Sequence, residues 1–117
     1  MTRTIVCYGD SNTHGANPSA PGRHPRDVRW PRVMERALGA DYEVIEEGLN
    51  GRCTVWDTPI EKGRNGLEYL SPCLLSHKPV DLVIIMLGTN DLKRIYGNTA
   101  AEIACGAARL VDEAQGT

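Results

Sequence analysis

The sequence has 117 residues, a net charge of −2 and a pI near 5.9, and 41% of its residues are hydrophobic. This composition is typical of a globular domain and excludes a basic footprint for nucleic acid or for an anionic membrane surface. No apolar run approaches the roughly 18 residues of a membrane span. We therefore expect no membrane segment, no secretory signal and a cytoplasmic protein.

Three short apolar runs predict strands, at residues 5–8, 42–45 and 82–87. The third is continuous and rich in β-branched residues, which predicts a strand buried on both faces of a parallel sheet. The second is only half apolar, so we expect it near an edge. The four cysteines have no C-x-x-C spacing, which predicts reduced and mostly buried thiols and neither a zinc site nor a disulfide framework; they are Cys7, Cys53, Cys73 and Cys105.

Helical patterns separate the strands. Apolar spacing, Pro31 in the first turn and Gly39 as a stop predict a helix from Trp30. A second helix is expected over 67–76, although Pro72 argues against it unless the helix begins near that residue. A third begins after Thr99, which forms a capping box with Glu102. Its buried stripe is expected to be Ile103, Ala107, Leu110, Val111 and Ala114. Strands that alternate with helices predict an α/β fold with a parallel sheet, and 18–29 and 58–65 are expected to be loops.

Three loops follow the predicted strands, with the sequences Gly9-Asp10-Ser11-Asn12, Gly48-Leu49-Asn50-Gly51-Arg52 and Gly88-Thr89-Asn90-Asp91. The loops after parallel strands meet at one edge of the sheet, where ligands bind. A hydroxyl beside several hydrogen-bond donors suits acyl transfer, because the oxyanion formed on attack needs donors already aimed at it. The backbone N–H groups of Ser11 and Gly51 and the Asn90 amide are the candidate donors.

Each loop also has a purely structural interpretation. Ser11 alone is a good helix N-cap, Gly51 alone a turn glycine, and Asn90-Asp91 alone a cap or Asx-turn pair. Their coincidence at three successive strand ends favours the catalytic interpretation.

The blocks "GDSNT", "GLNGR" and "GTND" resemble the first three blocks of the SGNH, or GDSL-type, hydrolases. The longer stretches "DVRWPRVMERALG", "VIEEGLNGRCTVWD" and "PVDLVIIMLGTNDLK" resemble the small arylesterase and acyltransferase branch of that superfamily. The resemblance implies a flavodoxin-like three-layer α/β/α fold in which residues 1–117 form the N-terminal portion of one domain. It makes Ser11 the nucleophile and assigns the oxyanion hole to Ser11, Gly51 and Asn90.

The resemblance also implies the partners: a short-chain acyl or aryl ester, water or an alcohol as acceptor, and a homo-oligomer, with no metal or other cofactor. We expect Asn12, His14 and Trp56 to contact substrate. Asp10 is expected to hold the Ser11 loop. Arg52 either shapes the entrance to the substrate pocket or pairs with Asp10 or Asp91. We expect Asp10, Arg52 and Asp91 to support the site without reacting.

The family takes its general base from a later Asp-x-x-His block, which this sequence does not contain. His14 is poorly placed to take the Ser11 proton, since both lie on one predicted helix. We therefore expect the base in a complementing C-terminal segment, and the chain alone to be almost inactive and to fold poorly, with an open edge beside residues 82–87. The alternative is a catalytically inactive α/β binding or assembly module, or an inert fragment. A nucleotide-binding domain, an α/β-hydrolase and a metal hydrolase are disfavoured, because the motifs and ligand clusters that each requires are absent.

Overall fold

The computed structural model describes residues 1–117. The chain divides into two compact units, the first formed by residues 1–50 and 79–86 and the second by residues 51–78 and 87–117. None of the helices combines the length and apolar character that crossing a membrane requires.

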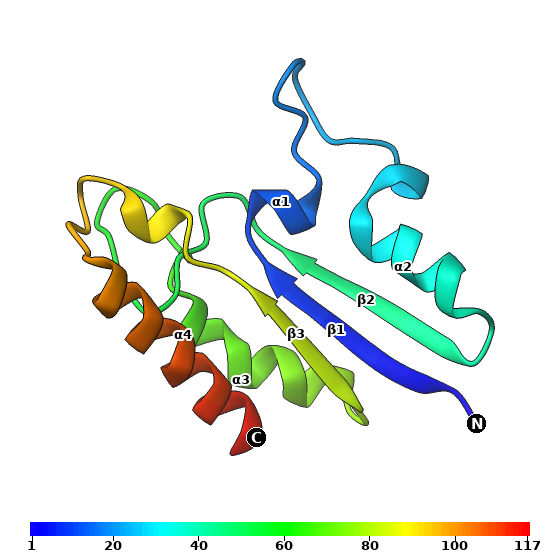
Figure 1. The fold of residues 1–117 in the computed structure, drawn as a ribbon. Coiled ribbons are helices and arrows are strands. Elements are labelled where there is room, and N and C mark those ends of the chain that lie inside the picture. Colours follow the sequence, from blue (N-terminus) through cyan, green and yellow to red (C-terminus); the bar gives the residue numbers. More distant parts are fainter. The chain divides into compact units, whose positions relative to one another are not determined.

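The first unit is built on a three-stranded parallel sheet with the order β2-β1-β3 (Figure 1). Its strands are β1 (Arg3–Gly9), β2 (Tyr42–Gly48) and β3 (Leu82–Met86). In the register, Gly9 at the end of β1 pairs with Gly48 on one side and with Met86 on the other. All three strands therefore end at the same level. Because β1 is the central strand, the segment that follows it begins at the middle of the carboxyl edge of the sheet.

The strand order corrects one expectation. The run 82–87 was predicted to be buried on both faces, but β3 is an edge strand with Leu82 50% and Met86 41% exposed. The buried central strand is β1, in which Val6, Cys7 and Tyr8 have no exposed surface. The apolar run of β3 thus lies beside an unpaired edge of this sheet, as the prediction of an open edge anticipated. β2 lies at the opposite edge, as predicted.

Three helical segments complete the first unit: α1 (Ser11–His14), the 3-10 turn η1 (Arg26–Val28) and α2 (Trp30–Leu38). As predicted, α2 has Pro31 in its first turn and ends at Gly39, whose φ of +93° only glycine adopts easily. Trp30 and Met34 of α2 pack against the core cluster around Cys7. Burial there raises the pKa of the Cys7 thiol to about 11, although the nearby Arg32 acts in the opposite direction.

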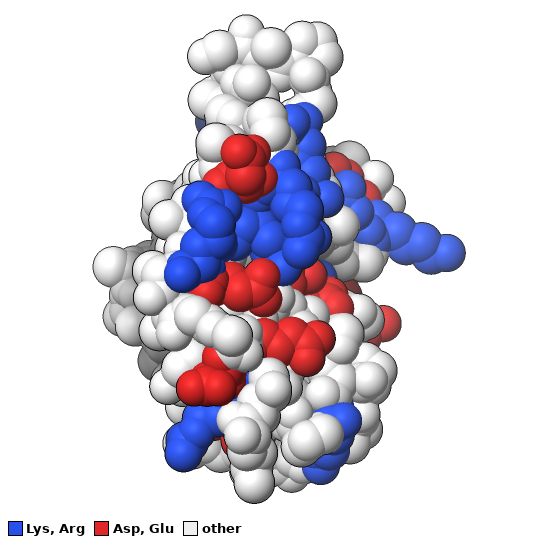
Figure 2. All heavy atoms as spheres, turned by 90° about the vertical axis from the view of Figure 1, so that its right-hand side faces the viewer, with Lys and Arg blue, Asp and Glu red and all other residues white.

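A charged cluster holds η1 and α2 against β2. The Glu46 carboxylate lies 3.2 Å from Arg29 Nε, 3.4 Å from Arg32 Nε and 3.8 Å from an Arg23 nitrogen. Arg32 also donates a hydrogen bond to the Val44 carbonyl. Figure 2 shows basic side chains gathered on this face with acidic ones directly beside them. Because Arg29 and Arg32 are mostly buried, their shared carboxylate is what makes their burial possible.

The second unit contains α3 (Gly66–His77), the 3-10 turn η2 (Asn90–Leu92) and α4 (Ala100–Gln115). Asn65 caps α3 by accepting the Leu67 N–H, and the predicted Thr99–Glu102 capping box begins α4. Pro72 lies inside α3, so the helix loses one backbone hydrogen bond there and still continues to His77.

The predicted buried stripe of α4 is wrong at one position. Val111 is 44% exposed, whereas Leu110 has no exposed surface. The buried side is centred on Gly106 and Leu110, and Ile103, Ala107 and Ala114 lie beside it half-buried. Gly106 lies at the centre of the buried side because it has no side chain, which lets α4 approach the neighbouring loop most closely at this residue.

The residue that Gly106 approaches in this loop is Thr54. A Cβ on Gly106 would overlap Thr54 Oγ1 and lie 3.0 Å from Thr54 Cβ. We expect Gly106→Ala to destabilise the chain by about 1–3 kcal/mol in urea unfolding, because Thr54 is itself buried and has no room to move. Gly116→Ala is the matched control, since its Cβ would meet nothing closer than 3.4 Å. Equal stability of the two variants would contradict the close approach.

Candidate active site

Ser11 begins α1 immediately behind the central strand. Asp10 is the N-cap: its Oδ1 accepts the Asn12 N–H at 3.0 Å, and its carbonyl accepts those of Thr13 at 3.1 Å and His14 at 2.9 Å. The cap position that the sequence left open for Ser11 thus belongs to Asp10. Ser11 is half-buried, and the side chain that caps the helix is that of Asp10.

Glycines set how closely α1 lies on the strand ends. A Cβ on Gly9 would overlap the Thr13 hydroxyl, and a Cβ on Gly48 would overlap the backbone of His14. The ends of β1 and β2 are therefore in direct contact with the one-turn helix. This contact fixes Ser11 at the carboxyl edge of the sheet, where the sequence predicted it.

His14 and Asn12 share α1 with Ser11. The His14 ring places Nδ1 3.3 Å from the Gly48 carbonyl oxygen, so the ring rests on the end of β2. The Asn12 side chain is exposed. The structure therefore brings Asp10, Ser11, Asn12 and His14 together on one turn of helix.

In the second unit, the two remaining candidate oxyanion donors lie on adjoining loops. Asn90 Nδ2 donates to the Arg52 carbonyl at 3.1 Å, which places the amide beside the residue that follows Gly51. Gly51 has a φ of +83°, the left-handed region that disfavours a side chain. Thus the structure brings Asn90 next to Gly51 and Arg52, from which it is distant in sequence.

A buried carboxylate locks these loops together. Asp91 has no exposed surface, and its two oxygens accept the Thr54 N–H at 2.9 Å and the Thr54 hydroxyl at 2.5 Å. The Asp91 carbonyl accepts from Asn98 Nδ2 at 3.2 Å. Sequence reasoning placed Asp91 in support of the site but missed Thr54, because nothing local distinguishes this threonine from any other.

Arg52 lies over an aromatic ring. Its guanidinium carbon is 5.4 Å from the centroid of Tyr69 on α3, and the residue is only 3% exposed. The sequence analysis expected Arg52 at the entrance or in an ion pair with Asp10 or Asp91, and it did not predict this contact with Tyr69.

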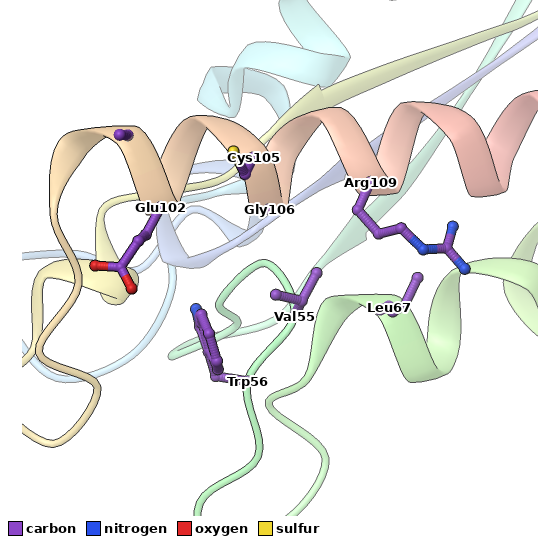
Figure 3. Close-up of a pocket in the computed structure, with 8 residues that line it drawn as sticks. Val55, Trp56, Leu67, Glu102, Cys105, Gly106 and Arg109 are labelled. Carbon is purple, nitrogen blue, oxygen red and sulfur yellow. The ribbon is translucent and has the colours of Figure 1, made fainter.

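Trp56 lines a pocket of about 450 Å³ beneath α4 (Figure 3). Val55 and Leu67 form its floor with Trp56, and α4 forms the opposite wall with Ala101, Glu102, Cys105, Gly106 and Arg109. The indole Nε1 is buried without a hydrogen-bond partner. Such a pocket accommodates an apolar group, and Cys105, which lines it, is the one exposed cysteine of the four.

Near the same loops, burial and a hydrogen bond with the Cys53 thiol raise the pKa of Tyr96 to about 12, and the charges of Glu61 and Asp91 add to the rise. The phenol is therefore neutral at physiological pH and serves as a hydrogen-bonding group.

Thr54→Val tests the lock between the two loops. It leaves one oxygen of the buried Asp91 without its hydroxyl donor, so we expect a loss of about 1–3 kcal/mol in the free energy of unfolding. Thr89→Val, at an exposed position with no capping hydrogen bond, is the control and should change stability by less than about 0.5 kcal/mol. A Thr54→Val chain as stable as the control would show that the Asp91 contacts do not hold the loops.

Comparison with known proteins identifies the class. The model of the GDSL-like Lipase/Acylhydrolase family matches residues 7–117, and the chain belongs to this family. The native M. smegmatis aryl esterase superposes with a TM-score of 0.93 at 49% identity over 96% of this chain. Est24, a carbohydrate acetylesterase from Sinorhizobium meliloti, superposes with a TM-score of 0.92 at 46% identity over 96% of this chain. The α/β fold is thus that of the SGNH hydrolases.

The chain spans only part of its relatives. It covers 54% of the M. smegmatis aryl esterase and 54% of Est24. Among curated proteins, the uncharacterized lipoprotein YqeF of Bacillus subtilis (strain 168) is 31% identical over 87 residues, which are 74% of this chain and 31% of YqeF.

Proposed function

We propose that this chain contributes the nucleophile and the oxyanion donors of a serine esterase that acts on short-chain acyl or aryl esters. The observation that carries the proposal is the position of Ser11, at the start of α1 behind the central strand, with Asp10 as the cap. Membership of the GDSL-like family supports the reaction class, and the aryl esterase and acetylesterase relatives support the substrate class.

In the proposed mechanism, Ser11 Oγ attacks the acyl carbon and its proton passes to a general base. The negative charge that develops on the carbonyl oxygen is stabilised by the N–H groups of Ser11 and Gly51 and by the Asn90 amide. The alcohol leaves with a proton, and water or a second alcohol then takes the acyl group from Ser11. The Asn90 hydrogen bond to Arg52 supports this assignment, because it holds the amide beside the Gly51 loop.

The general base is proposed to come from outside residues 1–117. His14 belongs to the same helical turn as Ser11 and rests on the Gly48 carbonyl, which argues for a role in the pocket wall. A complementing C-terminal segment would supply the histidine and its orienting aspartate. We place the assembled enzyme in the cytoplasm as a homo-oligomer.

A chimera tests this assignment. Residues 1–117 joined to the part of the M. smegmatis aryl esterase that lies beyond the match should hydrolyse 4-nitrophenyl acetate, whereas the 117-residue chain should not. Ser11→Ala in the chimera should lower kcat by about 10⁴–10⁶, because the nucleophile is lost. Ser19→Ala, in an exposed loop, is the matched control and should leave kcat unchanged.

A fluorophosphonate should label the chimera once, at Ser11, as read by intact-mass spectrometry. Hydrolysis that survives Ser11→Ala would contradict the nucleophile assignment. An inactive and unlabelled chimera that still folds would favour the alternative of a binding or assembly module.

Asn90→Ala tests the oxyanion donor. Removal of one donor should lower kcat of the chimera about 10²–10³-fold with little change in KM, because the interaction forms only in the transition state. Thermal unfolding must be followed in parallel, since Arg52 also loses its amide partner. A rise in KM with kcat unchanged would instead assign Asn90 to substrate binding.

A further inference from the structure

Two basic side chains lie beside Gly51. The position that a Cβ on Gly51 would occupy is 3.0 Å from Arg64 Nε and 3.8 Å from Lys93 Nζ. The side of Gly51 on which a side chain would lie is therefore occupied by Arg64, with the Lys93 ammonium close by. Neither residue is recognisable from the sequence as part of the site, because each lies in a loop with ordinary charges.

Both cations are anchored to the loops that carry the proposed oxyanion donors. The Arg64 carbonyl accepts the Cys53 N–H at 2.9 Å, and the Lys93 N–H donates to the Asn90 carbonyl at 3.1 Å. Arg64 is further held by its own side chain, which donates to the Lys62 carbonyl at 2.6 Å. These hydrogen bonds hold the backbones of both residues close to Gly51 and Asn90, and the side-chain rotamers then bring Arg64 Nε and Lys93 Nζ to Gly51.

The positive charge here is only partly compensated. One carboxylate, Glu61, serves both cations, at 3.3 Å from Arg64 and 3.8 Å from Lys93. The Lys93 pair is long and both of its members are 45% exposed, so water screens it strongly. In addition, Arg64 Nε is buried and has no hydrogen-bond partner. Residues 51–65 and 87–99 together contain five basic and three acidic residues.

We propose that Arg64 and Lys93 select esters that carry a carboxylate, such as monoesters of a short dicarboxylic acid. This inference rests on the proposed function, because it takes Gly51 as a donor to the ester oxygen. A carboxylate on the acyl chain would pair with the exposed Lys93 ammonium, and the only partly compensated charge of Arg64 would attract it as well.

The test measures binding and not turnover. The chimera with Ser11→Ala is titrated with succinanilic acid and with butyranilide, two aryl amides whose acyl chains differ in the terminal carboxylate. The readouts are the dissociation constants and the shift of the Gly51 amide signal in ¹⁵N NMR spectra. We expect the acid to bind about tenfold more tightly at low salt, and the difference to shrink as screening increases.

The variants separate charge selection from simple damage. Arg64→Gln with Lys93→Gln should abolish the preference for the acid and leave butyranilide binding unchanged. Glu61→Gln should increase the preference, because it releases both cations from their shared carboxylate. Lys62→Gln, which removes the charge of an exposed neighbour, is the matched control and should keep the preference.

Equal binding of the two probes, or no binding of either, would overturn the proposal. So would a preference that survives the double variant, or a double variant that weakens both probes in parallel. Because the protein in these titrations lacks the Ser11 hydroxyl, the binding result does not depend on whether Ser11 is the nucleophile.

Discussion

The second unit depends on one buried carboxylate. Asp91 would be costly to enclose without partners, and Thr54 satisfies both of its oxygens. Because Asp91 follows Asn90 directly, the same contact that makes the carboxylate tolerable also fixes where the Asn90 backbone lies. The Gly51 loop and the η2 turn are consequently one structure, and the site chemistry proposed for Gly51 and Asn90 is built on it.

The first unit reaches a similar precision by a different physical means. Around Ser11 the determining feature is the absence of side chains at Gly9 and Gly48, which lets α1 touch the ends of two strands. Packing of backbone against backbone leaves little freedom to a four-residue helix that would not form in isolation. Asp10 then satisfies the first N–H groups of that helix, and so the neighbouring hydroxyl is not needed as a cap.

Local chemistry explains what the sequence could predict. Capping residues, apolar spacing and Gly39 located α2 and α4 well, since these signals act over a single turn of helix. The burial of β3 on both faces and the burial of Val111 were predicted wrongly, because strand order and the close approach at Gly106 depend on residues far away in the chain. The positions of Ser11, Gly51 and Asn90 in loops that follow the strands could be predicted from the sequence, and their catalytic roles are proposals. Thr54, Arg64 and Lys93 could not be predicted, because their importance arises only from which loops meet.

The close approach of Gly106 to Thr54 has a consequence for the order in which the chain acquires structure. Thr54 and Asp91 are separated by 37 residues, and Gly106 lies further on still. Contacts of such long sequence separation form slowly, because loop closure must precede them. During synthesis, the Gly51 loop can form its hydrogen bonds with residues 64–67 early, but Thr54 lacks the Asp91 carboxylate and the close contact with Gly106 until the first half of α4 has emerged. The loop that the proposed chemistry needs is therefore completed late.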